Sequence, residues 1–178
     1  MEQILEEKVC LELAPKKNYI LSQGACFPLA VLRTEPIFVN WYYSNYMMPI
    51  AAWGGAGSPI VVEVADALSY GEGSNVYSKV MKISSIGTHV CSQINEIATV
   101  LKRYICAESY CALFLDFYYL KCANYTYEKN HYAHELLFYG YDDTIQIFNA
   151  YGYIDKSYRY VKISYTEVRE AFRVRLNM

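Results

Sequence analysis

The segment HYAHELLFYGYDDTIQIFN, residues 131–149, is the most informative part of the chain. An apolar run follows His134, turn-forming residues cluster at positions 140–144, and Ile145 and Ile147 then alternate with a polar residue. Such a cluster between two apolar runs is typical of a β-hairpin. The segment therefore predicts two antiparallel strands, with an imidazole opening the first and the carboxamide of Asn149 closing the second.

The register of this hairpin determines whether the two polar side chains meet. A turn that places residue 140 opposite 143, or 141 opposite 144, pairs His134 with residue 149 or 151. Either register puts His134 and Asn149 on one face of the sheet, roughly 5 to 8 Å apart between Cβ atoms. A three-residue loop would shift the register by one and send them to opposite faces. We expect the first arrangement, in which the carboxamide orients the imidazole as in a nucleophilic triad.

Composition narrows the class of protein. The chain has 178 residues, enough for one domain with a real core, and 54% hydrophobic with 19% charged residues is a globular composition. A net charge of −2 gives no reason to expect nucleic-acid or anionic-membrane partners. The 20 tyrosines are a surplus that suits half-buried strands, pocket walls and contact surfaces.

Cysteine spacing and the N-terminal segment indicate the compartment. The six cysteines, at positions 10, 26, 91, 106, 111 and 122, include no Cys-x-x-Cys pair and no zinc spacing, so we expect no metal site. The glycine-rich residues 53–59 lack the ending of a phosphate loop, so we expect no nucleotide cofactor. The acidic N-terminal segment is unlike a signal peptide, and no apolar run is long enough for a membrane span. We therefore expect a cytoplasmic protein with reduced thiols and no membrane contact.

One cysteine has a local sequence that predicts reactivity. In SQGACFPLAVL, residues 22–32, Gly24 loosens the approach to a helix, Pro28 fits a first helical turn, and apolar residues follow. This pattern places Cys26 at or just before the N-terminus of a buried helix, where free amides and the helix dipole favour a thiolate. The alternative is that Cys26 is a small buried hydrophobe, as most free cysteines are.

The remaining segments complete a segregated α+β pattern. We expect strands near residues 9–13, 60–64, 111–120 and 158–163, and an amphipathic helix over residues 90–105. Ser164 and Glu167 have capping-box spacing, which predicts a last helix over about residues 165–173. Residues 37–50 form a further buried segment whose type, helix or strand, the pattern leaves open. Helices and strands do not alternate regularly, so a parallel βαβ sheet is not predicted.

Cys26, His134 and Asn149 supply a thiol, a base and an orienting group in the chain order Cys, His, Asn. Papain-like thiol enzymes have the same order. Each residue also has a plainer interpretation: His134 as a core histidine bonded to a backbone carbonyl, and Asn149 as a strand-ending residue. We interpret His131 as a loop residue or substrate contact, and Asp116 as a secondary candidate that makes a pocket polar.

A family resemblance rests on these residues. The run LDFYYL at 115–120, His131-x-x-His134, Gly-Tyr-Asp at 140–142 and a strand ending at Asn149 resemble the papain-like domain of the butirosin-biosynthesis acyltransferase family. The same layout is more distantly similar to bacteriocin leader-processing cysteine peptidases. CFPL at 26–29 and WYYSNY at 41–46 also resemble small proteins of this group that are associated with nonribosomal peptide synthesis. The resemblance covers residues 112–172 well and the Cys26 region loosely.

The resemblance implies a single papain-like α+β domain over residues 1–178, with a helical first half carrying Cys26 packed on an antiparallel sheet carrying His134 and Asn149. It implies an acyltransferase that moves an aminoacyl or peptidyl group from a carrier-protein thioester, through acyl-Cys26, to a small amine in specialised-metabolite biosynthesis. His134 would be the base and Asn149 its orienter, and the Cys26 amide with one further donor would hold the oxyanion. Two alternatives stay open: a cysteine peptidase or amidase with the same three residues, and a non-catalytic protein that binds a carrier or peptide. None of the three needs a metal or cofactor.

Overall fold

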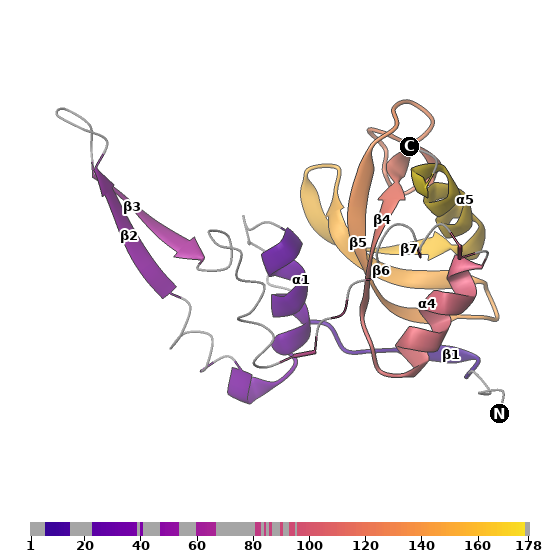
Figure 1. The fold of residues 1–178 in the computed structure, drawn as a ribbon, viewed down its shortest axis with the longest axis horizontal. Coiled ribbons are helices and arrows are strands. Elements are labelled where there is room, and N and C mark those ends of the chain that lie inside the picture. The colour runs from indigo at the N-terminus through magenta and orange to yellow at the C-terminus, as the bar shows by residue number, and fades with distance from the viewer. Residues whose placement is uncertain are drawn as a thin grey trace. The chain divides into compact units, whose positions relative to one another are not determined.

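The structure of the chain is a computed structural model (Figure 1). It describes residues 6–14, 23–38, 40, 47–53, 60–66, 81–82, 84, 86, 90, 93–94 and 96–176. By their contacts the residues form two compact units, one of Met1–Leu13 with Ser85–Met178 and one of Ala14–Ser84. The residues of the informative hairpin belong to the first unit, whereas Cys26 belongs to the second.

The first unit is built on a five-stranded antiparallel sheet. Its strands are β1 (Lys8–Cys10), β4 (Cys111–Asp116), β5 (Ala133–Asp142), β6 (Ile147–Ile154) and β7 (Ser157–Ser164). The central strand is β5: β6 pairs with one of its edges, and β1 and β4 pair with successive segments of the other. The strand β7 pairs with β6. The end of β4 therefore lies beside the start of β5.

Two helices, α4 (Ile97–Cys106) and α5 (Tyr165–Leu176), pack against this sheet and build the core with it (Figure 1). The apolar residues of α4 recur at helical spacing, so one stripe of the helix is buried. The largest fully buried side chains of the unit are Tyr141, Phe138, Phe148, Ile105, Leu115, Leu120, Leu136, Ile154, Ile163 and Val168. They come from both helices, from β4 to β6, from β7 and from the turn after β4, which makes this one continuous core.

The start of α5 confirms the predicted capping box. The amide of Glu167 donates to Oγ of Ser164 at 3.2 Å, and the amide of Ser164 donates to a carboxylate oxygen of Glu167 at 3.0 Å. Two backbone donors that the first helical turn leaves without partners are thereby satisfied. The predicted last strand, at residues 158–163, is also confirmed as the core of β7.

The predicted α+β class is confirmed, but two predicted elements have different limits. The helix expected over residues 90–105 is interrupted: Val90 is helical, but Glu96 has non-helical dihedral angles, φ −129° and ψ 78°, and α4 begins at Ile97. The strand expected over residues 111–120 ends at Asp116, because the carboxylate of Asp116 accepts the amide of Tyr118 at 3.0 Å. That bond starts a short 3₁₀ helix, η2 (Phe117–Tyr119).

The hairpin of β5 and β6 has a register that was not expected. Asp142 pairs with Ile147 across a turn of residues 143–146, and Asn149 pairs with Gly140. A bulge then lies on β5 between Phe138 and Gly140. A bulge inserts one residue into one strand, so the side chains of β5 change faces at this point.

The second unit contains α1 (Gln23–Leu32) and a two-stranded antiparallel sheet of β2 (Met47–Trp53) and β3 (Ile60–Asp66). The segment whose type was open, residues 37–50, therefore ends in a strand. The predicted strand at residues 60–64 is confirmed as part of β3. In neither unit does the described part of the chain contain a helix that is both long enough and apolar enough to cross a membrane.

Candidate functional site

The two side chains expected to form a pair, His134 and Asn149, lie apart. His134 pairs with Leu115 of β4, whereas Asn149 pairs with Gly140, which is six residues further along β5 and so roughly 20 Å from His134 at a rise of about 3.3 Å per residue. They also face opposite sides of the sheet, because His134 shares the alternation of two core residues at 136 and 138 while Asn149 lies between core residues at 148 and 150. The expected pairing of His134 with residue 149 or 151 is therefore wrong, and Asn149 does not orient His134.

Asn149 instead reaches across the sheet toward β1. Its Nδ2 atom lies 3.9 Å from Sγ of Cys10, and Gly140 occupies the β5 position between them. A Cβ atom on Gly140 would come within 3.0 Å of that Nδ2. The carboxamide thus lies over a glycine and makes a weak contact with a thiol, which is a structural arrangement rather than an orienter of imidazole.

His134 is held in a tautomer that does not suit a general base. Its Nδ1 atom accepts the amide of Glu135 at 2.9 Å, which assigns the proton of the neutral ring to Nε2. The ring packs beside Tyr132 and Phe117, with centroid distances of 5.3 and 5.8 Å. Burial lowers the pKa of His134, so the ring is neutral at pH 7. Neither ring nitrogen is then a free acceptor for a proton from a thiol.

A second histidine, His131, has what His134 lacks: a carboxylate bonded to its Nδ1 atom. Nδ1 of His131 lies 2.6 Å from Oδ2 of Asp116, a carboxylate that is fully buried. The other carboxylate oxygen accepts the amides of Tyr118 at 3.0 Å and Tyr132 at 3.1 Å. An ionised carboxylate only accepts hydrogen bonds, so Nδ1 of His131 is the donor and Nε2 carries the lone pair. The imidazole is 47% exposed, and Nε2 has no hydrogen-bond partner among the described residues.

The end of β4 and the segment before β5 bring Asp116 and His131 together. Asp116 closes β4 opposite Ala133, and His131 precedes β5 by two residues. The ring of Tyr118 stacks on the imidazole with centroids 4.4 Å apart and an interplanar angle of 18°, and Tyr119 lies 6.2 Å away. The imidazole is thus held by a buried carboxylate on one side and by an aromatic face on the other.

The sequence contains a signal for this pair that the hairpin pattern does not reveal. Asp116 is a single carboxylate at the end of an apolar strand, and a buried carboxylate requires a partner. Pairing that strand antiparallel with the next one brings its last residue beside the residues that precede His134. Interpreting Asp116 as a source of pocket polarity, and His131 as a loop residue or substrate contact, leaves the two residues unconnected.

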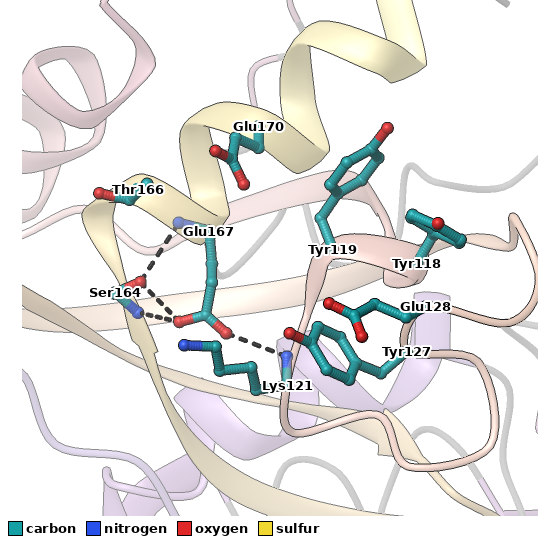
Figure 2. A pocket seen from close by; sticks show the side chains of 9 residues that line it. All are labelled: Tyr118, Tyr119, Lys121, Tyr127, Glu128, Ser164, Thr166, Glu167 and Glu170. Carbon is teal, nitrogen blue, oxygen red and sulfur yellow. Dashed lines mark hydrogen bonds between the residues drawn. The ribbon is translucent and has the colours of Figure 1, made fainter.

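A pocket of about 780 Å³ opens next to Tyr118, whose ring stacks on His131, and Figure 2 shows the side chains that line it. Its walls come from η2, from the loop of residues 121–130 and from the start of α5, and include Tyr118, Tyr119, Tyr127, Glu128, Glu167 and Glu170. Tyr118 therefore contacts His131 with its ring and also lines the pocket. The pocket lies entirely within the first unit.

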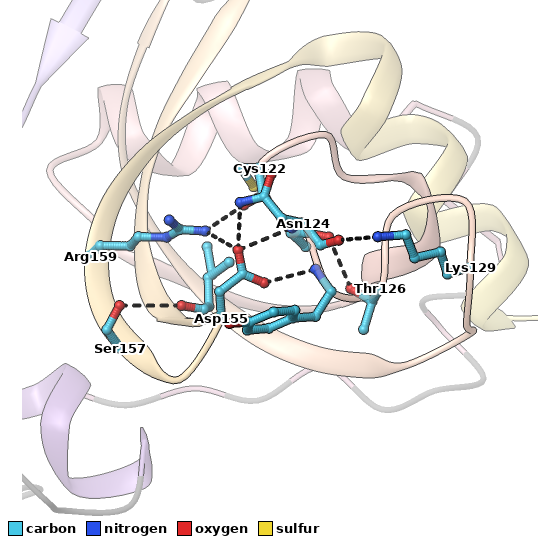
Figure 3. A network of polar contacts seen from close by, with 10 residues as sticks. Cys122, Asn124, Thr126, Lys129, Asp155, Ser157 and Arg159 are labelled. Atoms are coloured by element: carbon cyan, nitrogen blue, oxygen red, sulfur yellow. Dashed lines mark hydrogen bonds and ion pairs between the residues drawn. The ribbon is translucent and has the colours of Figure 1, made fainter.

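A polar network fixes the loop that forms one wall of the pocket (Figure 3). Asp155, in the turn between β6 and β7, accepts the amide and side chain of Asn124 at 3.0 and 2.8 Å and the amide of Tyr125 at 3.1 Å. Arg159 bridges Asp155 at 2.7 Å and the carbonyl of Cys122. These bonds outweigh the effect of burial and lower the pKa of Asp155, which keeps it ionised. The network ties the start of the loop to the sheet.

The cysteines differ in their surroundings. Cys26 is the fourth residue of α1, in its first turn rather than at or before its N-terminus, and Pro28 lies inside the helix. The side chain of Cys26 lies outside the described residues, as does all of Cys91. Burial raises the pKa of Cys111 and of Cys122 to about 11, so both are protonated thiols at neutral pH. Cys10 is exposed on β1.

Within the described residues, no group of three His, Cys, Asp or Glu side chains is placed to hold a metal ion. No protein-family model, no curated protein and no solved structure matches the chain. A functional proposal therefore depends on the residues of the chain and on their geometry.

Proposed function

We propose that the protein is a thiol-dependent acyltransferase with a papain-like arrangement, in which Cys26 is the nucleophile and His131 is the base. The observation that supports this proposal best is the bond between Nδ1 of His131 and the buried carboxylate of Asp116. A carboxylate on Nδ1 fixes the tautomer that leaves Nε2 able to accept a proton, which is how thiol and serine enzymes orient their base. His131 takes the role expected of His134, and Asp116 takes the role expected of Asn149.

The proposed reaction proceeds in two steps, acylation of Cys26 and transfer of the acyl group to an amine. The thiol of Cys26 gives its proton to the base, the thiolate attacks a carrier-protein thioester, and the carrier thiol leaves with that proton. A neutral amine then attacks acyl-Cys26, its nitrogen–carbon bond forms as the carbon–sulfur bond breaks, and the base returns the amine proton to the thiolate. The donor is an aminoacyl or peptidyl carrier thioester, as the family resemblance implies, and no metal or cofactor takes part in either step.

Intact-protein mass spectrometry tests this proposal. The protein is mixed with an aminoacyl thioester of N-acetylcysteamine, and the acyl adduct is followed over time. We expect an adduct on the natural chain and none on Cys26→Ala. General-base catalysis contributes about 10²- to 10⁴-fold, so His131→Ala should slow adduct formation by at least about 100-fold. His134→Ala is the matched control and should change the rate only a few-fold.

Two results would contradict the assignment. An adduct that persists on Cys26→Ala would remove the nucleophile, and a rate lost in His134→Ala but kept in His131→Ala would return the role of base to His134. If the adduct forms and is released to water as readily as to added amines, the protein is a cysteine hydrolase. The same three residues would then act with water as the acceptor.

A non-catalytic binding protein is the second candidate, and one observation favours it. Tyrosine rings follow one another across β5, β6 and β7, with centroid distances of 5.9 Å for Tyr139–Tyr160, 5.3 Å for Tyr151–Tyr160 and 5.2 Å for Tyr153–Tyr158. Tyr160 is 52% exposed and Tyr153 is 39% exposed. Exposed tyrosines are frequent in contact surfaces because they combine an apolar body with a polar tip. A complete absence of adduct with every thioester, together with binding of a carrier protein, would select this function.

A further inference from the structure

The aromatic ring that covers His131 lies differently from the rings that surround His134. The centroids of Tyr118 and His131 are 4.4 Å apart, and the two ring planes are only 18° from parallel. The rings beside His134, those of Tyr132 and Phe117, lie 5.3 and 5.8 Å away at interplanar angles of 63° and 30°. A parallel contact is lost when either ring tilts, so the stack on His131 opposes a tilt of the imidazole.

The hydrogen bond to Asp116 does not by itself fix the plane of this imidazole. It holds one ring atom, Nδ1 of His131, at 2.6 Å from the carboxylate. A histidine side chain has two rotatable torsions, and the ring can tilt about that atom when both turn together. The imidazole is also 47% exposed, and His131 lies two residues before the first residue of β5. A second contact is therefore needed if Nε2 is to keep one direction.

The residue that supplies the second contact, Tyr118, is itself held in place. Its amide donates to Oδ1 of Asp116 at 3.0 Å, and its carbonyl accepts the amide of Glu128 at 3.0 Å. The ring of Tyr119 meets the ring of Tyr118 edge-on, with centroids 5.0 Å apart and an interplanar angle of 68° (Figure 2). Asp116 aligns both partners of the stack, because one of its oxygens bonds the imidazole and the other bonds the backbone of the tyrosine.

We propose that Tyr118 is a positioning residue for His131: its ring fixes the plane of the imidazole that Asp116 holds at one atom, so that Nε2 keeps a single direction. The aromatic ring has this effect, and the phenol hydroxyl is not needed for it. A stacked aromatic pair changes the population of the stacked orientation by a factor of about two to ten. The consequence for acyl transfer rests on the proposed function, in which His131 is the base, whereas the consequence for the imidazole itself does not.

Spectra of the histidine rings test this inference without any acyl-transfer reaction. The three histidines of the full chain are labelled with ¹³C and ¹⁵N, and relaxation of their ring carbons reports the amplitude of ring motion. We expect Tyr118→Leu to increase the motion of the His131 ring and to remove the ring-current shift of its protons. Tyr118→Phe should leave both as in the natural chain, and His134 should be unchanged in both variants. Tyr125→Leu is the matched control, because this exposed ring lies under Lys156 instead, and it should change neither histidine.

The rate of adduct formation with the aminoacyl thioester is then compared among the same variants. Tyr118→Leu should slow it roughly twofold to tenfold, and Tyr118→Phe should retain the natural rate. An imidazole that stays as rigid in Tyr118→Leu as in the natural chain would overturn the inference, even if acyl-Cys26 forms normally. Equal mobility in Tyr118→Phe and Tyr118→Leu would assign the effect to the hydroxyl and overturn it as well.

Two further outcomes separate this inference from the proposed function. A mobile imidazole together with an unchanged rate of adduct formation would overturn the positioning role of Tyr118. If Tyr118→Leu frees the imidazole but no thioester ever acylates the natural chain, the ring of Tyr118 still positions His131, and the acyltransferase proposal fails.

Discussion

His131 and His134 differ in which ring nitrogen carries the proton. In each case the hydrogen-bond partner of Nδ1 is the reason. Nδ1 of His131 meets the carboxylate of Asp116, which can only accept, whereas Nδ1 of His134 meets the amide of Glu135, which can only donate. The first imidazole therefore presents a lone pair at Nε2 and the second presents a proton. Asp116 also accepts two backbone amides at the start of η2 and before β5, so it stabilises the fold at the same position.

Asp116→Asn tests this assignment of the tautomers. The carboxamide oxygen can still accept the amides of Tyr118 and Tyr132, but its NH₂ group faces Nδ1 of His131 and donates to it. The proton of the neutral ring then moves to Nε2, as on His134. We expect long-range ¹H–¹⁵N spectra of the imidazoles to show His131 change tautomer while His134 keeps its own. The free energy of unfolding should fall by about 1 to 3 kcal/mol, as for a weakened hydrogen bond to a buried charge. A proton that stays on Nδ1 of His131 in the variant would contradict the assignment.

The order in which the thiols react is a second prediction at this scale. Cys26 should react with iodoacetamide fastest and with a pH profile below that of a free thiol near roughly 8.5, because the first turn of a helix favours a thiolate. Cys10 is exposed and should react next. Cys111 and Cys122, whose pKa burial raises to about 11, should react last. Peptide mapping after a short pulse at neutral pH measures the order, and a Cys26 no faster than Cys10 would remove the basis for its role.

At the scale of elements, the Gly-Tyr-Asp motif attaches β1 to β5. Gly140 lies directly opposite Cys10, and a Cβ atom on it would come within 2.7 Å of the backbone oxygen of Val9. The hydroxyl of Tyr141, a fully buried residue, donates to the backbone oxygen of Glu6 at 2.8 Å. Asp142 forms an ion pair with Lys8 at 2.8 Å. A motif that contributes to a family resemblance is thus explained here by the docking of a short strand.

Gly140→Ala should loosen β1 without dissolving the sheet. The added methyl group meets backbone atoms of Val9 and of Cys10, at 2.7 and 3.0 Å, and these cannot move aside by rotating a side chain. Overpacking of this kind costs about 1 to 3 kcal/mol. Hydrogen exchange should accelerate at the amide of Leu11, which donates to Tyr139 at 2.8 Å, while the amides between β6 and β7 keep their protection and serve as the internal control. Unchanged exchange at Leu11 would show that β1 is not attached in this way.

The elements of the second half could be predicted from sequence because each has a local cause. Alternating apolar residues indicate β7, helical spacing indicates α4, and the capping box of Ser164 and Glu167 indicates the start of α5. The pairing of His134 with Asn149 was wrong because register is not local. It depends on a turn of residues 143–146 and on one bulge residue, and a single inserted residue moves every following side chain to the other face. The contact between Asp116 and His131 was missed for a related reason, since it requires knowing that β4 pairs with β5.

At the scale of the whole molecule, three ionisable groups of the first unit make its stability depend on pH in the same direction. Burial lowers the pKa of His134, so the unfolded chain binds a proton more readily than the folded one. The bond to Lys8 lowers the pKa of Asp142, and bonds from Asn124, Tyr125 and Arg159 outweigh burial and lower that of Asp155. In all three cases the unfolded state takes up protons first, so acid favours unfolding.

The stabilising contributions of these three groups should therefore be lost in two stages as the pH is lowered. The contribution of His134 is fully present above its unfolded pKa of about 6.5 and declines as the pH falls from there to the folded value. The contributions of Asp142 and Asp155 are present above about 4 and are lost below it, as the folded carboxylates take up protons. Urea unfolding followed by circular dichroism at about pH 8, 5.5 and 3.5 measures both stages. His134→Gln should flatten the first stage alone, Asp155→Asn should flatten part of the second alone, and Glu108→Gln should change neither. A first stage that survives in His134→Gln would show that another group causes it, and the assignment of this stage to His134 would then fail.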